Sequence, residues 1–415
     1  MSEHDQLDFW TQLLHLDDYH VVHIRKDTPA DPIRLTLLPN WPVGFCPRCR
    51  RASDHIHRRS ASQTVKDLDL QEQSVELIIR TYQFACPHCG HFFTPVPDFW
   101  VSGAHATERF LEHAARLIRI SDIANAAAFL GVPEKTLEKW YYDYVERQRR
   151  TPPTPCGPIT HIGIDELTVT HESNPYVAVL VDHTHECVLD VLPNRLKKTV
   201  QDYLQRHLDQ GVLAHVTEVT TDMWDGYVEA VREVFKDKVS VTIDRFHVMK
   251  AFQDHLEAAR REIQRQLPKD EAKALKGTRW LWLTNQENLS AEERAELSLL
   301  GQQFPLLGQL REQRDKLRDL FEDKSLGTAA AGAKRLRDWL KEARELGLKA
   351  LEGFCGTLER WLDKIANYFI DRASNGRVEG FNRGFRGILW RAFGMFNFDH
   401  FRLRVLDRFG KPKPC

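Results

Sequence analysis

The chain has 415 residues, of which 42% are hydrophobic and 28% charged, and its formal net charge is −1. These values are typical of globular proteins with a sizeable core, and the length predicts about two or three domains. No apolar run approaches the roughly 20 residues of a membrane span, which excludes a membrane-spanning protein at the level of the sequence.

Charge is unevenly distributed along the chain. Residues 372–415 contain ten Arg or Lys against three acids, whereas residues 1–45 lean acidic. A net charge near zero with a basic C-terminal segment fits a protein that binds nucleic acid through part of its surface. It fits an ordinary enzyme almost as well. The N-terminus, "MSEHDQLDFW", lacks the basic and apolar regions of a signal peptide. We therefore expect a reducing compartment, in which cysteines are thiols or metal ligands.

Four cysteines have metal-ligand spacing. "CPRC" (46–49) and "CPHC" (86–89) are two C-x-x-C units separated by 36 residues. Each unit can form a tight turn that points two thiolates at one tetrahedral centre. "SVELIIRTYQF" (74–84) alternates like a strand that leads into the second unit, and the long linker must contain extra strands or a loop. The pattern predicts a zinc ribbon; a redox pair is the alternative. The four predicted ligands of one structural Zn²⁺ are Cys46, Cys49, Cys86 and Cys89.

"SDIANAAAFLGVPEKTLEKWYYDYVERQRR" (121–150) is typical of a helix-turn-helix. Ser121 can cap a short helix, Gly131 supplies the turn, and Pro133 stands where a second helix can begin. The positions expected to pack inward are Leu137, Trp140 and Tyr144. The exposed face of this second helix then carries two candidate DNA contacts, Lys135 and Lys139. A generic helical hairpin is the alternative interpretation.

"TPPTPCGP" (151–158) predicts a hinge between domains, and an α/β pattern follows it. Strands are expected in 159–170, 175–183, 186–193, 214–227 (ending at Asp222) and 239–250 (ending at Asp244), and helices in 197–208 and 227–235. Three strands followed by alternating helices and strands is the order of an RNase H-like sheet. In that fold the first and fourth strands are neighbours.

Two carboxylates would then meet at one edge of the sheet: Asp165 in the first strand and Asp222 at the end of the fourth. Adjacent carboxylates repel unless cations separate them, and hard divalent cations suit oxygen ligands. Two such ions can support phosphodiester chemistry, and a third carboxylate would complete the site. Glu166 and Asp225 are the main rivals, although Glu166 points to the opposite face of its strand. Each acid alone can instead be a helix cap or an ion-pair partner.

Residues 251–370 have the pattern of successive charged amphipathic helices and no metal or nucleophile motif. We interpret them as an all-α insertion. It could dimerise, shield the site, hold a DNA strand or serve as a packing spacer.

"NGRVEGFNRGFR" (375–386) carries one acid, Glu379, among three arginines. A helix that begins near Ser374 or Asn375 would place Glu379, Asn382 and Arg383 on one face. With Arg386 one further turn along, such a face offers a metal ligand, an amide and two guanidiniums to a phosphate backbone. The candidate DNA contacts of this segment are Arg377, Arg383 and Arg386.

Together these motifs resemble the DDE transposases of the bacterial ISL3 insertion-sequence family over nearly the whole chain. The resemblance is carried by the zinc ribbon, the helix-turn-helix, "HIGIDE", "TTDMWDGY", "IDRFHVMKAF" and "SNGRVEGFNRGFRGILWRAFGMFNFDHFRLRVL". It implies that Asp165, Asp222 and Glu379 are the catalytic triad and hold Mg²⁺ or Mn²⁺. It also implies an auxiliary role for Asp244 and His247.

The fold class expected from this resemblance is multidomain α+β, with an N-terminal segment and zinc ribbon in 1–100 and a helix-turn-helix in 101–150. An RNase H-like α/β catalytic domain, 159–250 and 371–415, would be interrupted by the all-α insertion 251–370.

The expected function is that of a DNA transposase. It would bind the terminal inverted repeats of double-stranded DNA and then cleave and transfer strands, also into target DNA, without a covalent protein–DNA intermediate. Joining two element ends implies a homodimer or higher oligomer, in the bacterial cytoplasm at the nucleoid. The alternatives are a catalytically silent zinc-containing regulator derived from a transposase, and a structure-specific nuclease on the same fold.

Overall fold

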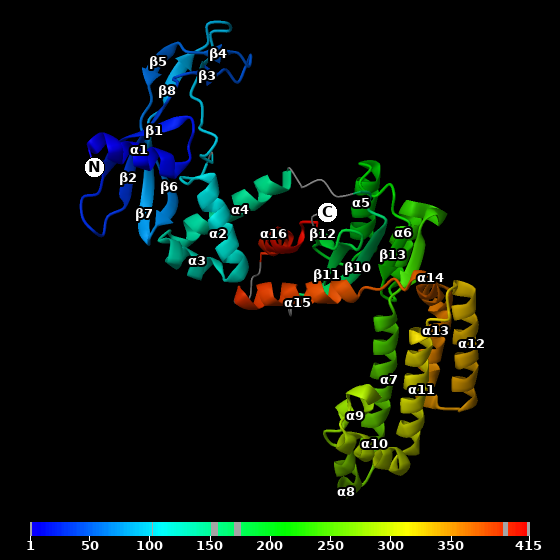
Figure 1. The fold of residues 1–415 in the computed structure, drawn as a ribbon. Helices are drawn as coiled ribbons and strands as arrows, with labels where there is room; N and C mark the ends of the chain where they lie inside the picture. The colour runs from blue at the N-terminus through cyan, green and yellow to red at the C-terminus, as the bar shows by residue number, and fades with distance from the viewer. Residues whose placement is uncertain (1, 102, 151–156, 170–175, 393–396, 413–415) are drawn as a thin grey trace. The chain divides into compact units, whose positions relative to one another are not determined.

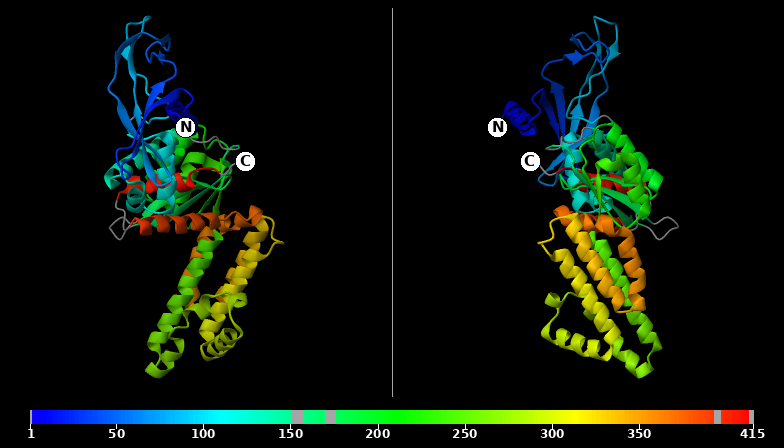
Figure 2. Two further views of the ribbon diagram at one scale, coloured as in Figure 1. Left: turned by 60° about the vertical axis from the view of Figure 1, so that its left-hand side comes forward. Right: turned by 90° about the vertical axis from the view of Figure 1, so that its right-hand side faces the viewer.

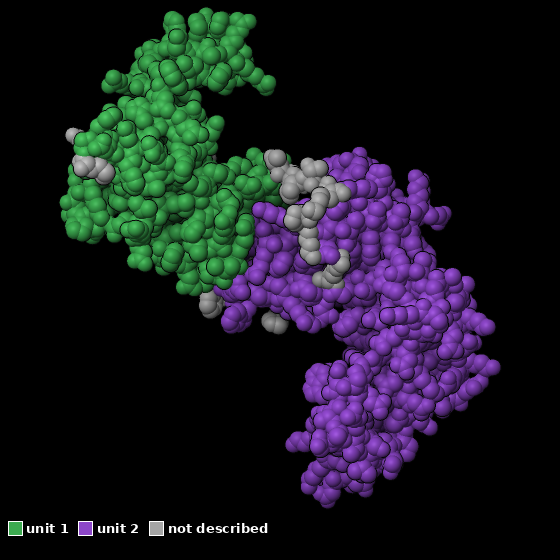
Figure 3. Space-filling model, viewed as in Figure 1, with its two compact units in different colours: residues 1–151 green, residues 152–415 purple. Residues whose placement is uncertain are grey.

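The computed structural model divides the chain into two compact units, Met1–Thr151 and Pro152–Cys415 (Figure 3). The boundary coincides with the Pro-rich stretch that predicts a hinge, of which residues 151–156 lie outside the described residues. The structure describes every residue except 1, 102, 151–156, 170–175, 393–396 and 413–415.

The first unit contains a four-stranded sheet of order β1-β2-β7-β6 (Figure 1). The elements are α1 (Glu3–Leu14), β1 (Tyr19–Arg25), β2 (Ile33–Pro39), β6 (Gln63–Leu70) and β7 (Gln73–Ile79). The prediction of one strand over 74–84 is wrong, because β7 ends at Ile79 and the next strand, β8, belongs to another sheet. The linker between the cysteine pairs does contain the extra strands that its length requires.

The zinc-ribbon segment contains two small sheets. Their strands are β3 (Gly44–Phe45) with β4 (Ala52–Ser53), and β5 (Ile56–Arg59) with β8 (Tyr82–Ala85) and β9 (Phe92–Phe93). Strand β8 ends directly before Cys86, and β3 ends directly before Cys46. Each cysteine pair therefore follows a strand that fixes its direction.

Three helices complete the first unit: α2 (Glu108–Ile120), α3 (Ile123–Leu130) and α4 (Glu134–Arg150). Asp122 caps α3 by accepting a hydrogen bond from the Asn125 amide, 2.8 Å. The expected Ser121 cap is wrong, because that residue ends α2 and its hydroxyl donates to the Leu117 carbonyl. Gly131 supplies the left-handed turn, with φ 60°. Three residues of α4 are buried as expected: Leu137, Trp140 and Tyr144.

The second unit contains a five-stranded sheet of order β12-β11-β10-β13-β14 (Figure 1). Its strands are β10 (His161–Thr168), β11 (Tyr176–Asp182), β12 (Cys187–Leu192), β13 (Glu218–Thr221) and β14 (Ser240–Ile243). The first three are antiparallel, and β10, β13 and β14 run parallel. Strands β10 and β13 are neighbours, as the sequence predicted for the first and fourth strands.

Helices cover both faces of this sheet. One face carries α5 (Lys197–Asp209) and α6 (Asp225–Phe235), and the other carries α15 (Gly376–Arg391) and α16 (Phe398–Phe409). Ile162 and Ile164 pack on the α5–α6 side, whereas Leu167 packs with α15 and α16. Since side chains alternate along a strand, Asp165 lies on the α15 side.

Long helices follow β14 and lie side by side (Figure 2). They are α7 (Arg245–Gln266), α11 (Pro305–Glu322), α12 (Ala329–Glu345) and α13 (Lys349–Ala366); the shorter helices are α8 (Lys269–Ala272), α9 (Arg279–Leu283), α10 (Ala291–Gln303) and α14 (Tyr368–Asp371). Ser290 and Glu293 form the capping box that the sequence indicates at the start of α10. No helix in the described part of the chain is long and apolar enough to cross a membrane.

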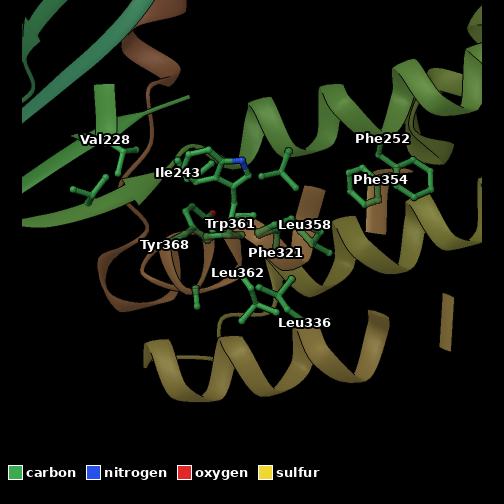
Figure 4. Packing of buried hydrophobic residues seen from close by; sticks show 14 of the residues in the cluster. Val228, Ile243, Phe252, Phe321, Leu336, Phe354, Leu358, Trp361, Leu362 and Tyr368 are labelled. Atoms are coloured by element: carbon green, nitrogen blue, oxygen red, sulfur yellow. The ribbon is translucent and has the colours of Figure 1, made fainter. Parts of the chain in front are cut away.

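The helical region and the sheet share one hydrophobic core. Trp361 and Tyr368, from α13 and α14, pack in the same cluster as Ile243 of β14 and Val228 of α6 (Figure 4). The continuous core holds α7 and α11 in a defined position relative to the carboxyl ends of the parallel strands.

The start of α15 is fixed on the sheet by Asn375, which is 3% exposed. Its Nδ2 donates to the Ile164 carbonyl, 3.3 Å, and its Oδ1 accepts from the Thr220 hydroxyl, 2.5 Å. Gly163 makes room for this contact, because a Cβ there would overlap His183 Nε2 and lie 2.7 Å from Asn375 Oδ1. The helix that carries Glu379 therefore begins at a point set by β10.

We predict that Gly163→Ala lowers the free energy of unfolding by about 1–3 kcal/mol, because the added methyl group must displace Asn375 or His183. Urea denaturation of the whole chain measures this loss. Gly380→Ala is the control on α15, where no neighbouring atom lies within 4 Å of the added Cβ. Equal stability of the two variants would contradict the proposed role of Asn375.

Candidate functional site

Three aspartates occupy one row of the sheet. Gly163 of β10 lies opposite Thr220 of β13, and the parallel register continues into β14. Two residues further along each strand are Asp165, Asp222 and Asp244, the last two just past the strand ends. The register therefore brings the three aspartates to neighbouring positions, with Asp165 on the α15 side of the sheet.

A cavity of about 600 Å³ opens at this row and is lined by Asp165, Asp244 and Glu379. Asn382 of α15 donates from Nδ2 to Asp165 Oδ2, 3.0 Å, and His247 Nε2 lies 3.7 Å from Asp165 Oδ1. Both α15 and α7 therefore contact the first aspartate.

The three aspartates are in an environment that disfavours their charged forms. Burial raises the pKa of Asp165 and Asp244, and it raises that of Asp222 to about 6. The positive potential of His247 offsets part of each rise, while the charge of Asp165 adds to the rise at Asp222. Carboxylates held together in this way become favourable as anions only when positive charge joins them.

Two buried oxygen atoms of the site have no hydrogen-bond partner among the described residues. They are Asp244 Oδ1 and Asn382 Oδ1, on residues that are 1% and 7% exposed. Buried acceptors without a donor are costly, and a bound cation or ligand would satisfy them. A donor set made of carboxylate and amide oxygens is the set that Mg²⁺ and Mn²⁺ prefer. The residues present thus fit hard divalent cations.

Glu379 reaches the cavity from α15, one turn after Asn375. Its side chain is 39% exposed and forms an ion pair of 3.3 Å with Arg383. Among the described residues, only the four ribbon cysteines bring three or more ligand atoms within 4.8 Å of one another. The carboxylates of Asp165, Asp222 and Glu379 are therefore less closely gathered than a closed metal site.

Both rival acids are engaged by arginines. Glu166 accepts a hydrogen bond of 2.6 Å from Arg195, although it also lines the cavity. Asp225, at the start of α6, pairs with Arg360 of α13 and is not among the cavity-lining residues described. Asp222 is not among the residues that line the cavity either, so Asp165 and Asp244 are the aspartates of the row that line it.

The candidate DNA contacts are distributed over both units. Arg386 lines the cavity, and Arg383 is 76% exposed beside Glu379. The side chain of Arg377 lies outside the described residues. In the first unit, Lys135 and Lys139 are exposed on α4, as expected for this helix face.

The four ribbon cysteines form a tight cluster. Cys46 Sγ lies 3.6 Å from Cys89 Sγ, and Cys49 Sγ lies 3.5 Å from Cys86 Sγ. All four sulfur atoms lie within 4.8 Å of one another. This set has the ligand type and number of a closed structural zinc site.

The two cysteine turns have the same backbone geometry. The amides of Arg50 and Gly90 donate to the carbonyls of Cys46 and Cys86, at 2.8 and 2.9 Å. Arg50 and Gly90 both have positive φ, 58° and 68°. Two equivalent turns bring four thiols to one centre, which favours a metal site over a pair of separate redox units.

Comparison with known proteins matches both units to one family. The ISL3 transposase family model covers residues 162–405, and the zinc-finger model of transposases IS204, IS1001, IS1096 and IS1165 covers residues 42–89. The chain belongs to the ISL3 family of transposases. Its family assignment rests on a match that spans more than half of the sequence.

Relatives of this transposase match along most of their length. It is 25% identical over 391 residues to the transposase for insertion sequence element IS1001 of Bordetella parapertussis, covering 93% of this chain and 94% of that protein. It is 24% identical to the transposase for IS1557 of Mycobacterium tuberculosis, covering 84% and 82%. The Drosophila P element transposase strand transfer complex aligns with a TM-score of 0.40 at 14% identity, over 72% of this chain and 91% of that chain.

Sequence reasoning missed the contacts that position the site of this transposase. It placed Asn375 at a helix start but did not predict its contact with β10, and it assigned no role to Thr220 or His183. One signal was present in the sequence: Gly163, two residues before Asp165, is a glycine inside a strand. Such a glycine often marks a close backbone approach.

The pKa of Asp222 predicts a change in stability with pH. Its folded pKa of about 6 exceeds the unfolded value of about 3.9, so the folded state binds more protons between these values and loses stability as pH rises. Asp222→Asn removes this loss. In EDTA, the variant should be more stable than wild type by about 1–2 kcal/mol near neutral pH, after allowance for partial solvent exposure.

Urea denaturation between about pH 4 and pH 7 measures the difference. Asp225→Asn is the matched control, and it should lose stability instead, because Asp225 pairs with Arg360 at a helix N-terminus. A destabilised Asp222→Asn protein at neutral pH in EDTA would show that the aspartate is not held under electrostatic stress.

Proposed function

We propose that this transposase cleaves and joins DNA by two-metal-ion phosphoryl transfer at Asp165, Asp222 and Glu379. The observation that carries the proposal is the row of three aspartates on neighbouring parallel strands, of which Asp165 and Asp244 are buried and line one cavity with Glu379. Open α/β sheets bind ligands at this edge. The unpartnered oxygen atoms of Asp244 and Asn382 add acceptors for cations there.

The strand arrangement supports an RNase H-like catalytic domain. The sheet has three antiparallel strands followed by two parallel ones, with β10 at the centre. We assign 159–250 and 371–415 to this domain and the helices of 251–370 to an all-α insertion. The insertion then separates the second catalytic acid from the third.

Each residue of the site has a distinct part in the proposed reaction. When bound, the divalent cations would activate the attacking water or 3′-OH and stabilise the leaving oxygen. Asn382 holds the Asp165 carboxylate in one orientation through its 3.0 Å hydrogen bond. Asp222 supplies the neighbouring carboxylate and Glu379 the third. His247, whose imidazole lies 3.7 Å from Asp165, is placed to orient the scissile phosphate.

The first unit supplies DNA recognition in this proposal. We assign residues 1–100 to an N-terminal segment and a zinc ribbon, in which the cysteine cluster holds one structural Zn²⁺. In 101–150, helices α3 and α4 form a helix-turn-helix whose second helix presents Lys135 and Lys139 to double-stranded DNA of the terminal inverted repeats. Transfer of two element ends into target DNA requires at least two active sites, so the active form is a homodimer or a higher oligomer.

An end-cleavage and strand-transfer assay tests the proposal, with duplex DNA that carries the element ends and with Mg²⁺ in the buffer. Glu379→Gln should lower the cleavage rate at least about a hundredfold, or about 2.7 kcal/mol, because a metal ligand is removed. Glu352→Gln, at an exposed position of α13, is the control and should cleave like wild type.

Two results would contradict the proposal in different ways. If Glu379→Gln cleaves as fast as wild type, the third acid has been assigned wrongly. If the wild-type protein binds the ends tightly but does not cut them with Mg²⁺ or Mn²⁺, the chain is a DNA-binding regulator that keeps the fold without the chemistry.

A further inference from the structure

The cavity at the acidic row has a second wall, formed by the helical region. Five of its residues make up what we call the α7–α11 wall: Phe246, Lys250, Gln253, Arg314 and Arg318. Within each helix, the residues of this wall follow one another at intervals of three or four positions, so they lie on one face of that helix. The two helices pack against each other and lie side by side in Figures 1 and 2.

The α7–α11 wall carries three cations beside Glu322 of α11, which also lines the cavity, whereas the opposite side of the cavity is acidic. Lys250 is exposed there, and Arg318 is held by Glu287 and Glu322 at 2.9 and 3.0 Å. Its third cation, Arg314, has a side chain that is only 3% exposed. Positive charge on this wall suits an anion that approaches the carboxylates from the helical side.

Arg314 is the buried cation of this wall. Its terminal nitrogens donate to Asp315, to the Leu283 carbonyl and to Asn285 Oδ1, but its Nε is buried without a partner among the described residues. Burial lowers the pKa of Arg314, and the nearby charge of Arg311 adds to the effect. The Nε nitrogen itself is not accessible from the cavity, so Arg314 contributes positive potential to the wall and not an open hydrogen-bond donor.

Phe246 adds an aromatic surface to the same wall. It is 49% exposed, although most large apolar side chains of this unit are buried. It precedes His247, whose Nε2 lies 3.7 Å from Asp165 Oδ1, so the ring lies next to the acidic row. Exposed aromatic rings beside basic residues are the usual binding surface for unpaired bases, because every base can stack on them.

The volume of the cavity limits what can enter. At about 600 Å³ it has the size of a pocket for a small molecule and accepts a nucleotide or two. A base-paired duplex does not fit, whereas a nucleotide removed from the stack does.

We propose that the α7–α11 wall binds an unpaired nucleotide of the DNA strand next to the scissile phosphate, with its base on Phe246 and its phosphate at Lys250, within the positive potential of Arg314. The inference rests on the proposed function and identifies the part of the substrate that the helical region holds. Under this proposal the helical region is a component of the active site. It also prepares the DNA by keeping one nucleotide outside the duplex.

Fluorescence anisotropy with a labelled oligothymidine tests the proposal on the full chain in EDTA, where no cleavage takes place. Phe246→Ala should weaken binding about tenfold, as expected for the loss of one stacked base. Phe246→Trp should bind at least as well as wild type, which separates stacking from any effect on folding. A blunt duplex of the same length should show no difference among the three proteins.

The proposed contact between Lys250 and a phosphate is tested by the salt dependence of oligothymidine binding. Lys250→Gln should reduce the slope of log affinity against log salt concentration by about 0.7, the value for one phosphate of a single strand. Arg265→Gln is the matched control, since it removes an exposed cation from the same helix but outside the residues that line the cavity. It should leave the slope unchanged.

The binding experiments and the cleavage assay can fail independently of each other. If Phe246→Ala and Lys250→Gln bind oligothymidine like wild type while wild type cleaves DNA, the inference is wrong and the proposed function stands. Equal losses for Phe246→Ala with single-stranded and duplex probes would also overturn it. If both variants lose single-strand binding as stated while wild type fails to cleave, the wall binds nucleotides and the catalytic proposal is wrong.

Discussion

The desolvation of neighbouring carboxylates in one row of the sheet, to which their mutual repulsion adds, is the constraint on which the rest of the second unit depends. Asp165, Asp222 and Asp244 lie in or just past neighbouring parallel strands, the first and last buried and Asp222 half-buried, and desolvation raises the pKa of each. Such a row is unfavourable for folding unless cations, or groups that donate hydrogen bonds, compensate it. Asn382 and His247 do so in part, from two different helices. The remaining unpaired oxygen atoms are what a metal-dependent enzyme would keep available.

The third acid reaches this row because α15 is fixed on the sheet at its first turn. Asn375 packs against the strand at Gly163 and contacts Thr220, so Glu379 follows one helical turn later at a defined place. A helix anchored only by apolar contacts could slide along its axis by a residue or more. The polar contacts of Asn375 are directional and remove that freedom. The shared hydrophobic core then holds α7 and α11 over the same cavity.

Local patterns in the sequence predicted much of this arrangement. The two C-x-x-C units and the turn at Gly131 are each determined within a few residues, and the structure contains them. Contacts between distant segments were not predictable in this way. Asn375 and the Ile164 carbonyl are 211 positions apart, and the four-stranded sheet of the first unit pairs β2 with β7 in parallel. Neither pairing leaves a periodic pattern in the local sequence. The α7–α11 wall is likewise formed by two helices that are distant in the sequence.

The central claim is that Asp165, Asp222 and Glu379 hold metal at one centre. Iron-directed cleavage of the protein backbone tests it most directly: Fe²⁺ replaces Mg²⁺, and ascorbate with peroxide generates hydroxyl radicals at the bound ion. We predict cuts near Asp165, Asp222 and Glu379 together, all suppressed by excess Mg²⁺ and all lost in Asp165→Asn. Cuts confined to the ribbon cysteines, or centred on Asp225 instead, would contradict the account.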